Sequence, residues 1–148
     1  MKGLAMVLLA VSLAGAGAET ETETYETETE ASYTDEDLWY LSRVIQAESG
    51  YCEREMQIGV GSVLINRVNS ELFPNSIREC VEQPGQYATA GWLASQEPTE
   101  QVYEVAIDLL ENGSQYPENV LYQANYPLGS AVYKTLYTPY SVMYFSYQ

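Results

Sequence analysis

Apolar positions recur at helical spacing at the start of the folded part of the chain. Leu38, Leu41 and Ile45 repeat at intervals of three and four residues, which predicts a helix over 35–49. Thr34 followed by Asp37 forms a capping box where this helix should begin. At about 100° per residue, Glu48 falls within the same apolar stripe. The pattern therefore places a carboxylate where a core residue is expected.

Three further helices are predicted, over residues 53–69, 76–82 and 99–112. The first of them, "EREMQIGVGSVLINRVN", is apolar on most sides, so we expect it at the centre of the domain. Gly59 and Gly61 are unfavourable inside a helix, and close approach by a neighbouring helix would account for them. The 99–112 helix has one apolar and one acidic face and is expected to be structural. We expect a loop between 83 and 98.

The final third of the chain is rich in tyrosine and contains two strand-like runs. These are "NVLYQANY", residues 119–126, and "SVMYFSYQ", residues 141–148. We expect the two runs to pair in a small sheet. The whole pattern predicts one α+β domain over 33–148, mostly helical, with a small antiparallel β-sheet toward its end.

The first 32 residues differ from the rest. Residues 1–18, "MKGLAMVLLAVSLAGAGA", combine a basic start, an apolar run and a small-residue ending, which is typical of a signal peptide. A retained membrane anchor is the alternative. Residues 19–32 are rich in Glu and Thr, and we expect a solvated, disordered spacer there. The sequence thus predicts export, with no membrane association after cleavage of the signal.

The amino-acid composition limits the catalytic mechanisms and the metal sites that the chain could have. The chain has no histidine, two cysteines and a net charge of −15. Catalytic pairs of serine or cysteine with histidine are therefore excluded, as are histidine-rich or cysteine-rich zinc sites. We expect neither a metal nor a cofactor. The acidic surface repels nucleic acid, so no nucleic-acid partner is expected. Acid–base chemistry must come from carboxylates, tyrosines or lysine.

Glu48 is the carboxylate that fits such chemistry. A buried carboxyl group is costly unless it is hydrogen-bonded or protonated. Apolar surroundings and the negative end of its own helix both favour the neutral acid, which suits protonation of a glycosidic oxygen. The alternative is a glutamate that only reaches solvent at a helix end or pairs with an arginine.

Five segments resemble the SleB-like cell wall hydrolases, the family of the spore cortex-lytic enzyme's catalytic domain. They are "LSRVIQAESG", "QIGVGSVLINRV", "FPNSI", "QPGQY" and "PENVLYQANYPLGSAVY". The resemblance implies a lysozyme-related helical fold and an exported or spore-associated lytic transglycosylase acting on peptidoglycan glycan strands. It also implies that Glu48 is the motif glutamate, acting as the only acid and base. Glu53 and Glu55 are candidates for a second carboxylate, although both suit the first turn of a helix.

The motif segments also supply candidate substrate-binding residues. Aromatic faces and amide groups suit sugars, and the segments carry both in Gln83, Gln86, Tyr87, Tyr122 and Gln123. The segment "YTPYSVMYFSYQ" departs from the family pattern, which has a Gly-(Asn)-His-aromatic-Phe segment there. A noncatalytic peptidoglycan-binding module that retains the fold and the sugar cleft is therefore the alternative function.

Cys52 and Cys80 leave two alternatives open. In an exported protein they could form a disulfide that closes a long loop and contributes about 3 kcal/mol. They could equally remain two inert thiols. A catalytic role for either is not expected, because no histidine is present to activate a thiol.

Overall fold

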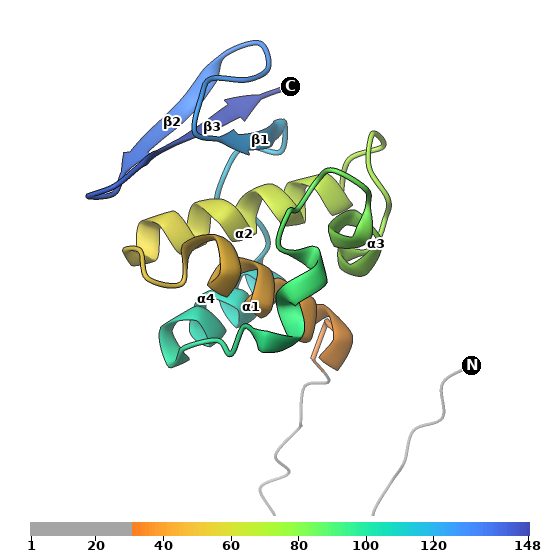
Figure 1. Ribbon diagram of the computed structural model, residues 1–148. Coiled ribbons are helices and arrows are strands. Elements are labelled where there is room, and N and C mark those ends of the chain that lie inside the picture. Colours follow the sequence, from red (N-terminus) through yellow and green to blue (C-terminus); the bar gives the residue numbers. More distant parts are fainter. Residues whose placement is uncertain (1–30) are drawn as a thin grey trace, which may run out of the picture.

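The computed structural model describes residues 31–148 (Figure 1). The predicted signal peptide, residues 1–18, and nearly all of the predicted spacer, residues 19–32, lie outside the described residues. In the part of the chain that is described, no helix is both long enough and apolar enough to cross a membrane.

The helices follow the sequence pattern closely. They are α1 (Asp35–Ser49), α2 (Arg54–Val68), α3 (Ile77–Glu82) and α4 (Glu100–Asn112). A short 3-10 helix, η1 (Ala90–Ser95), lies inside the segment that the sequence predicts to be a loop. Short 3-10 turns lack the apolar periodicity that marks a longer helix, so the pattern gives no signal for this one.

The strands form one antiparallel sheet with the order β1-β3-β2. They are β1 (Val120–Ala124), β2 (Val132–Tyr137) and β3 (Val142–Tyr147). The predicted pairing of the two strand-like runs is confirmed, because β1 pairs with β3. The sequence pattern misses β2, which pairs with the other edge of β3. The α+β fold with a small sheet after the helices is therefore confirmed, with one more strand than predicted.

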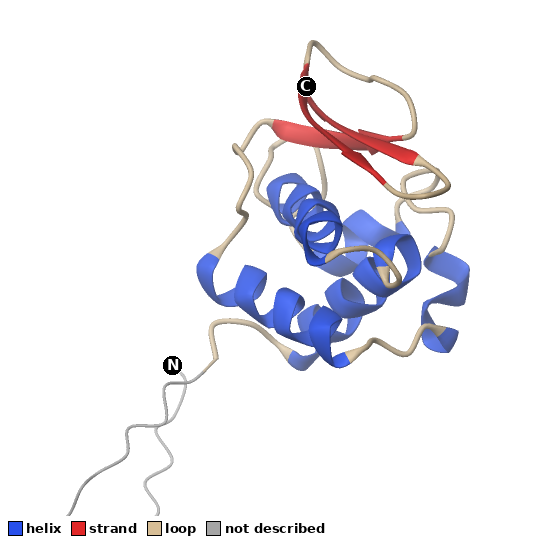
Figure 2. Cartoon of the chain, turned by 90° about the vertical axis from the view of Figure 1, so that its left-hand side faces the viewer, coloured by secondary structure: helices blue, strands red, loops and turns tan. Residues whose placement is uncertain are grey.

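Helix α2 is the central element. It lies between the sheet on one side and α1 and α4 on the other (Figures 1 and 2). This position explains why it is apolar on most sides: ten consecutive residues from Gly59 to Val68 include only one, Val68, that is not buried. The largest fully buried side chains come from all three layers. They include Leu41, Ile45, Leu64, Leu109, Leu121 and Phe145.

The two glycines of α2 admit close neighbours on opposite sides. A methyl group on Gly61 would lie 2.4 Å from Leu109 Cδ1 and 2.9 Å from Ile45 Cδ1, so the predicted approach of neighbouring helices is confirmed there. At Gly59 the prediction that the close neighbour is another helix is wrong. The close neighbours are the ring of Phe145, on β3, and the hydroxyl of Tyr116, at 2.6 and 2.7 Å.

Replacing Gly61 with alanine should therefore destabilise the protein, although alanine favours a helix by about 1 kcal/mol. The added methyl overpacks a buried contact between three helices, and we expect a net loss of about 1–3 kcal/mol. Urea unfolding would measure it. Gly91→Ala is the matched control, because nothing lies within 4 Å of a methyl group there. Equal stability of the two variants would contradict the packing argument.

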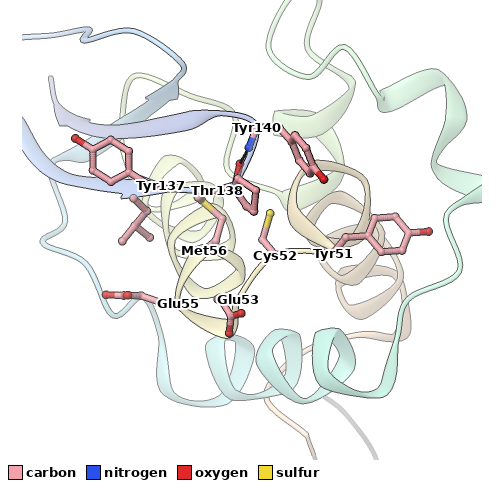
Figure 3. Close-up of a pocket in the computed structure, with 10 residues that line it drawn as sticks. Tyr51, Cys52, Glu53, Glu55, Met56, Tyr137, Thr138 and Tyr140 are labelled. Atoms are coloured by element: carbon pink, nitrogen blue, oxygen red, sulfur yellow. Dashed lines mark hydrogen bonds between the residues drawn. The ribbon is translucent and has the colours of Figure 1, made fainter.

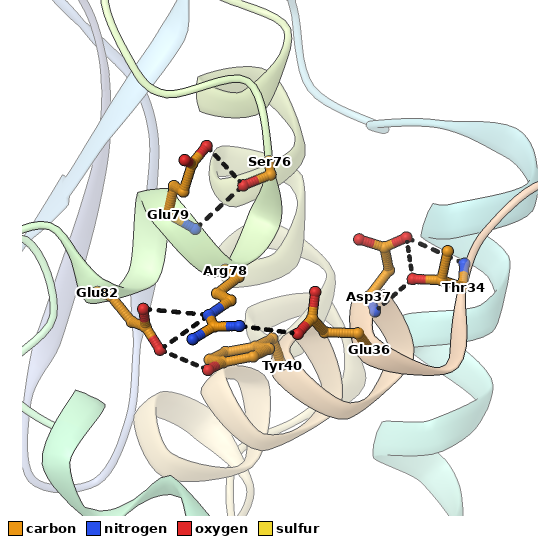
Figure 4. A network of polar contacts seen from close by, with 8 residues as sticks. All are labelled: Thr34, Glu36, Asp37, Tyr40, Ser76, Arg78, Glu79 and Glu82. Carbon is orange, nitrogen blue, oxygen red and sulfur yellow. Dashed lines mark hydrogen bonds and ion pairs between the residues drawn. The ribbon is translucent and has the colours of Figure 1, made fainter.

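The start of α1 is fixed by the polar contacts that the sequence predicts. Asp37 N donates to Thr34 Oγ1, and Thr34 N donates to Asp37 Oδ2, which completes the capping box (Figure 4). Farther along α1, Tyr40 donates a hydrogen bond to Glu82 of α3, and this bond lowers the pKa of the Glu82 carboxyl, with Arg78 adding to the effect. The contact between Tyr40 and Glu82 joins the first half of α1 to α3.

Candidate active site

Glu48 lies in the last turn of α1 and is half-buried. Its Oε1 atom accepts a hydrogen bond of 2.9 Å from Thr89 Oγ1, which comes from the segment between α3 and η1. The apolar stripe of α1 is therefore continued by a carboxylate that the neighbouring segment holds in place. No pattern in the sequence points to Thr89 as its partner, since the two residues lie far apart in the chain.

A small recess of about 140 Å³ opens beside Glu48. One wall comes from the start of α2 and the residues before it, with Cys52 and Met56. The opposite wall comes from the β2–β3 turn and the start of β3, and comprises Thr138, Ser141, Val142 and Met143. That wall belongs to "YTPYSVMYFSYQ", the segment in which the sequence departs from the family pattern. The departure therefore lies in the lining of the recess that contains the candidate acid.

A second pocket of about 400 Å³ adjoins this recess (Figure 3). Cys52, Met56 and Thr138 line both spaces, so the two are neighbours. The remaining lining residues of the larger pocket come from the α1–α2 connection, the start of α2, and the β2–β3 hairpin. They are Tyr51, Glu53, Glu55, Leu136, Tyr137, Pro139 and Tyr140. No pattern in the sequence points to the three tyrosines, because an exposed tyrosine leaves no periodic signal.

The segment "QPGQY" lies close to Glu48, but its residues differ in their surroundings. Gln86 is exposed and Gln83 is half-buried, whereas Tyr87 is only 6% exposed. Burial raises the pKa of the Tyr87 hydroxyl to about 12. The Arg67 guanidinium lies over its ring, 5.4 Å from the centroid. Tyr87 thus packs into the core and anchors this segment, while Gln83 and Gln86 are the side chains that keep some exposure.

The two candidates on β1 lie on opposite faces of the sheet. Gln123 pairs with Phe145, whose ring contacts α2, so Gln123 is on the helix-facing side. Met143 of the recess wall is two residues from Phe145 and shares that side. Tyr122 pairs with Ser146 and is therefore on the other face, beside Gly129. The register thus places Gln123, and not Tyr122, on the sheet face that forms the recess.

Two of the predicted amides have an unused acceptor. The Oε1 atoms of Gln83 and Gln123 are buried without a hydrogen-bond partner among the described residues. Buried polar atoms are normally paired. Neither glutamine is among the residues that line the recess or the larger pocket, so substrate contact by Gln83 and Gln123 stays a prediction.

The second-carboxylate candidates lie in the larger pocket and not in the recess. Glu53 and Glu55 are both exposed at the start of α2, and Glu55 is paired with Lys134 of β2. Of the described residues that line the recess, Glu48 is the only one with a carboxyl group. The site therefore presents one carboxyl where bond cleavage would occur. Among the described residues, no cluster of three potential metal ligands is found.

The structure leaves Cys52 and Cys80 as free thiols, so the disulfide alternative is not realised. Cys52 precedes α2, whereas Cys80 lies near Arg67 at the other end of that helix, as the effect of the Arg67 charge on the Cys80 pKa shows. A helix of this length separates its ends by about 20 Å, and a disulfide requires Cα atoms within about 7 Å. Burial raises the pKa of the Cys80 thiol to about 11, and the thiol donates to Pro74 O.

The comparisons with known proteins show the family of the chain. A family model described as cell wall hydrolase matches residues 53–141, and the chain belongs to this family. The match begins after Glu48, so the assignment of Glu48 as the motif glutamate depends on the neighbouring "AESG" segment and on the geometry above.

Two curated relatives are both spore cortex-lytic enzymes. The protein from Bacillus subtilis (strain 168) is 30% identical over 94 residues, covering 63% of this chain and 30% of the relative. The protein from Oceanobacillus iheyensis is 28% identical over 97 residues, covering 63% of this chain and 34% of the relative. The chain thus spans about a third of the length of these relatives. No solved structure matches it, so the relation to lysozyme stays a prediction.

Proposed function

We propose that the protein is a peptidoglycan lytic transglycosylase that cleaves the bond between N-acetylmuramic acid and N-acetylglucosamine. The observation that carries the proposal is the position of Glu48, a half-buried carboxyl held by Thr89 in a recess with no other carboxyl group. Glycosidases that use water usually need two carboxylates. A single one is enough when the substrate supplies its own nucleophile.

In the proposed reaction Glu48 begins as the neutral acid. It donates its proton to the glycosidic oxygen as the bond from that oxygen to the muramoyl C1 atom breaks. The C6 hydroxyl of the same muramoyl ring then attacks C1, and the Glu48 carboxylate accepts the hydroxyl proton. The products are a 1,6-anhydromuramoyl end and a free N-acetylglucosamine end. Glu48 is again protonated, and no water is consumed.

The recess beside Glu48 and the adjoining pocket have different roles in the proposed reaction. The recess is smaller than the roughly 300 Å³ at which ligand pockets begin, so it can surround only the reacting atoms. The adjoining pocket of about 400 Å³ is large enough for a sugar ring. Thr89 would hold the Glu48 carboxyl in place, because its hydroxyl donates to Oε1 and leaves the other oxygen to act on the substrate.

We also propose that the protein acts outside the cytoplasm, in the cell wall or the spore. The signal-like segment at residues 1–18 and the names of the relatives support this location. The substrate would then be the glycan strand of the vegetative wall or of the spore cortex.

The analysis of reaction products tests the mechanism. The full chain would be incubated with purified vegetative and cortex peptidoglycan, and the released fragments identified by mass spectrometry. We expect fragments that end in 1,6-anhydromuramic acid. Reducing ends that have gained water would show a hydrolase and contradict the single-carboxylate mechanism.

A noncatalytic peptidoglycan-binding module is the second candidate function. The observation that favours it is the recess wall formed by the β2–β3 turn and the start of β3, where Val142 and Met143 are apolar and only Thr138 and Ser141 carry hydroxyl groups. A module would bind peptidoglycan and release no fragments, and Glu48→Gln would leave the binding unchanged. Release of anhydromuramoyl fragments would exclude this function.

A further inference from the structure

The larger pocket has an aromatic rim that core packing does not explain. Tyr51 is 99% exposed, Tyr140 is 98% exposed and Tyr137 is 79% exposed. Tyr137 lies at one end of the pocket, and Tyr51 and Tyr140 lie at the other (Figure 3). Exposed apolar side chains gathered around a pocket mark a binding surface. Because these rings are almost free of contacts, their faces are open to a ligand.

The rest of the pocket combines an apolar lining with acidic groups. Met56, Leu136 and Pro139 contribute apolar surface to the pocket. Glu53 and Glu55 contribute the acidic groups, from the start of α2 (Figure 3). Glu55 is already paired with Lys134. Glu53 makes no ion pair with any described residue and no side-chain hydrogen bond to cap α2. Its carboxylate is therefore free to accept a hydrogen bond.

This combination matches the chemistry of a sugar ring. A pyranose has apolar C–H groups that stack on aromatic faces, and hydroxyl donors at its edge that suit a carboxylate. The acidic groups of the pocket and the net charge of −15 disfavour binding of a sugar ring that carries a carboxylate, because like charges repel. An acetamido methyl group would gain contact with the apolar lining.

We propose that this pocket binds an uncharged N-acetylated pyranose ring of the glycan strand, next to the bond that Glu48 cleaves. That the ligand is part of a glycan strand rests on the proposed function. The placement rests on Cys52, Met56 and Thr138, which line both the pocket and the Glu48 recess. A ring in the pocket lies directly beside the recess. The pocket therefore fixes which bond of the glycan strand lies beside Glu48. Tyr51, Tyr137 and Tyr140 hold the sugar ring in the pocket.

A binding experiment tests the proposal without catalysis. The full chain carrying Glu48→Gln would be titrated with the uncharged tetramer of N-acetylglucosamine in a calorimeter. Adding Tyr51→Ala or Tyr140→Ala should weaken binding about tenfold, which corresponds to the loss of one stacked aromatic contact. Tyr126→Ala is the matched control, because Tyr126 is 59% exposed but does not line the pocket. It should leave the affinity unchanged.

A second experiment compares the binding of a charged and an uncharged oligosaccharide. A hyaluronan tetrasaccharide also contains N-acetylglucosamine, but alternate rings carry a carboxylate. We expect it to bind at least about tenfold more weakly than the uncharged tetramer at low ionic strength. Equal affinity would overturn the preference for an uncharged ring.

Other outcomes would overturn the pocket itself. They are no binding of the uncharged tetramer, or weakening by the control Tyr126→Ala that equals the weakening by Tyr51→Ala and Tyr140→Ala. The melting temperature should be the same for Tyr51→Ala, Tyr126→Ala and Tyr140→Ala, because all three side chains are exposed.

Failure of the proposed function gives a different result. Binding that depends on Tyr51 and Tyr140, in a protein that cleaves no peptidoglycan when Glu48 is intact, would support the pocket and reject the enzyme. Cleavage that is unaffected by both substitutions would support the enzyme and reject the pocket.

Discussion

Glu48→Gln should lower the rate of peptidoglycan cleavage by about 10³–10⁴-fold, the full contribution of a general acid–base group. The amide can neither donate a proton to the glycosidic oxygen nor accept one from the C6 hydroxyl. It has nearly the same shape as the carboxyl, and its oxygen can still accept the hydrogen bond from Thr89. We therefore expect the melting temperature to stay close to that of the unsubstituted protein. Fragment release and thermal unfolding would measure the two effects.

The control for this experiment is Glu118→Gln, the same chemical change at an exposed position before β1. It should cleave at the normal rate. Glu53→Gln provides the sharper comparison, because Glu53 is a candidate second carboxylate in the adjoining pocket. If Glu53→Gln stops cleavage as completely as Glu48→Gln, two carboxylates share the chemistry and the proposed mechanism is wrong.

Phe145→Ala should cause the largest loss of stability, about 3–5 kcal/mol. Phe145 is fully buried, packs edge-on against Tyr116 and fills the space above Gly59. It also lies on the central strand of the sheet. Truncation would leave a cavity between the sheet and α2, and a domain of this size has only about 5–15 kcal/mol of stability in total.

Urea unfolding would measure this loss as a lower midpoint at an unchanged slope. Tyr126→Ala removes an aromatic ring of similar size from the surface and should change the stability by less than about 0.5 kcal/mol. A loss below about 1 kcal/mol for Phe145→Ala would show that the sheet is not held by this contact.

The helices could be predicted because their signals are local. The Thr34 and Asp37 capping box is present, and α3 ends before Pro84 as the sequence indicates. The strand β2 was missed although it forms a local hairpin with β3. It is an edge strand with no buried residue, so burial imposes no regular alternation of apolar and polar positions on its sequence.

The candidate site shows the same limit. The apolar periodicity of α1 was enough to mark Glu48 as unusual. Neither its hydrogen-bond partner nor the wall of its recess could be found in this way, because Thr89 and Met143 come from distant segments. Tyr87 illustrates a different difficulty. A tyrosine in a loop motif suits both a sugar contact and a core position, and only the fold shows that this one is buried.

The central position of α2 has a consequence for the width of the active site. Glu48 is carried by α1 on one side of α2, and the opposite wall of the recess is carried by the sheet on the other side. Their separation therefore depends on how closely each layer can settle on α2, and the glycines at 59 and 61 set both contacts. Because Gly59 and Gly61 carry hydrogen atoms instead of methyl groups, both layers can approach α2 closely, and we expect substitutions there to change the width of the candidate site and the turnover at positions that no substrate touches.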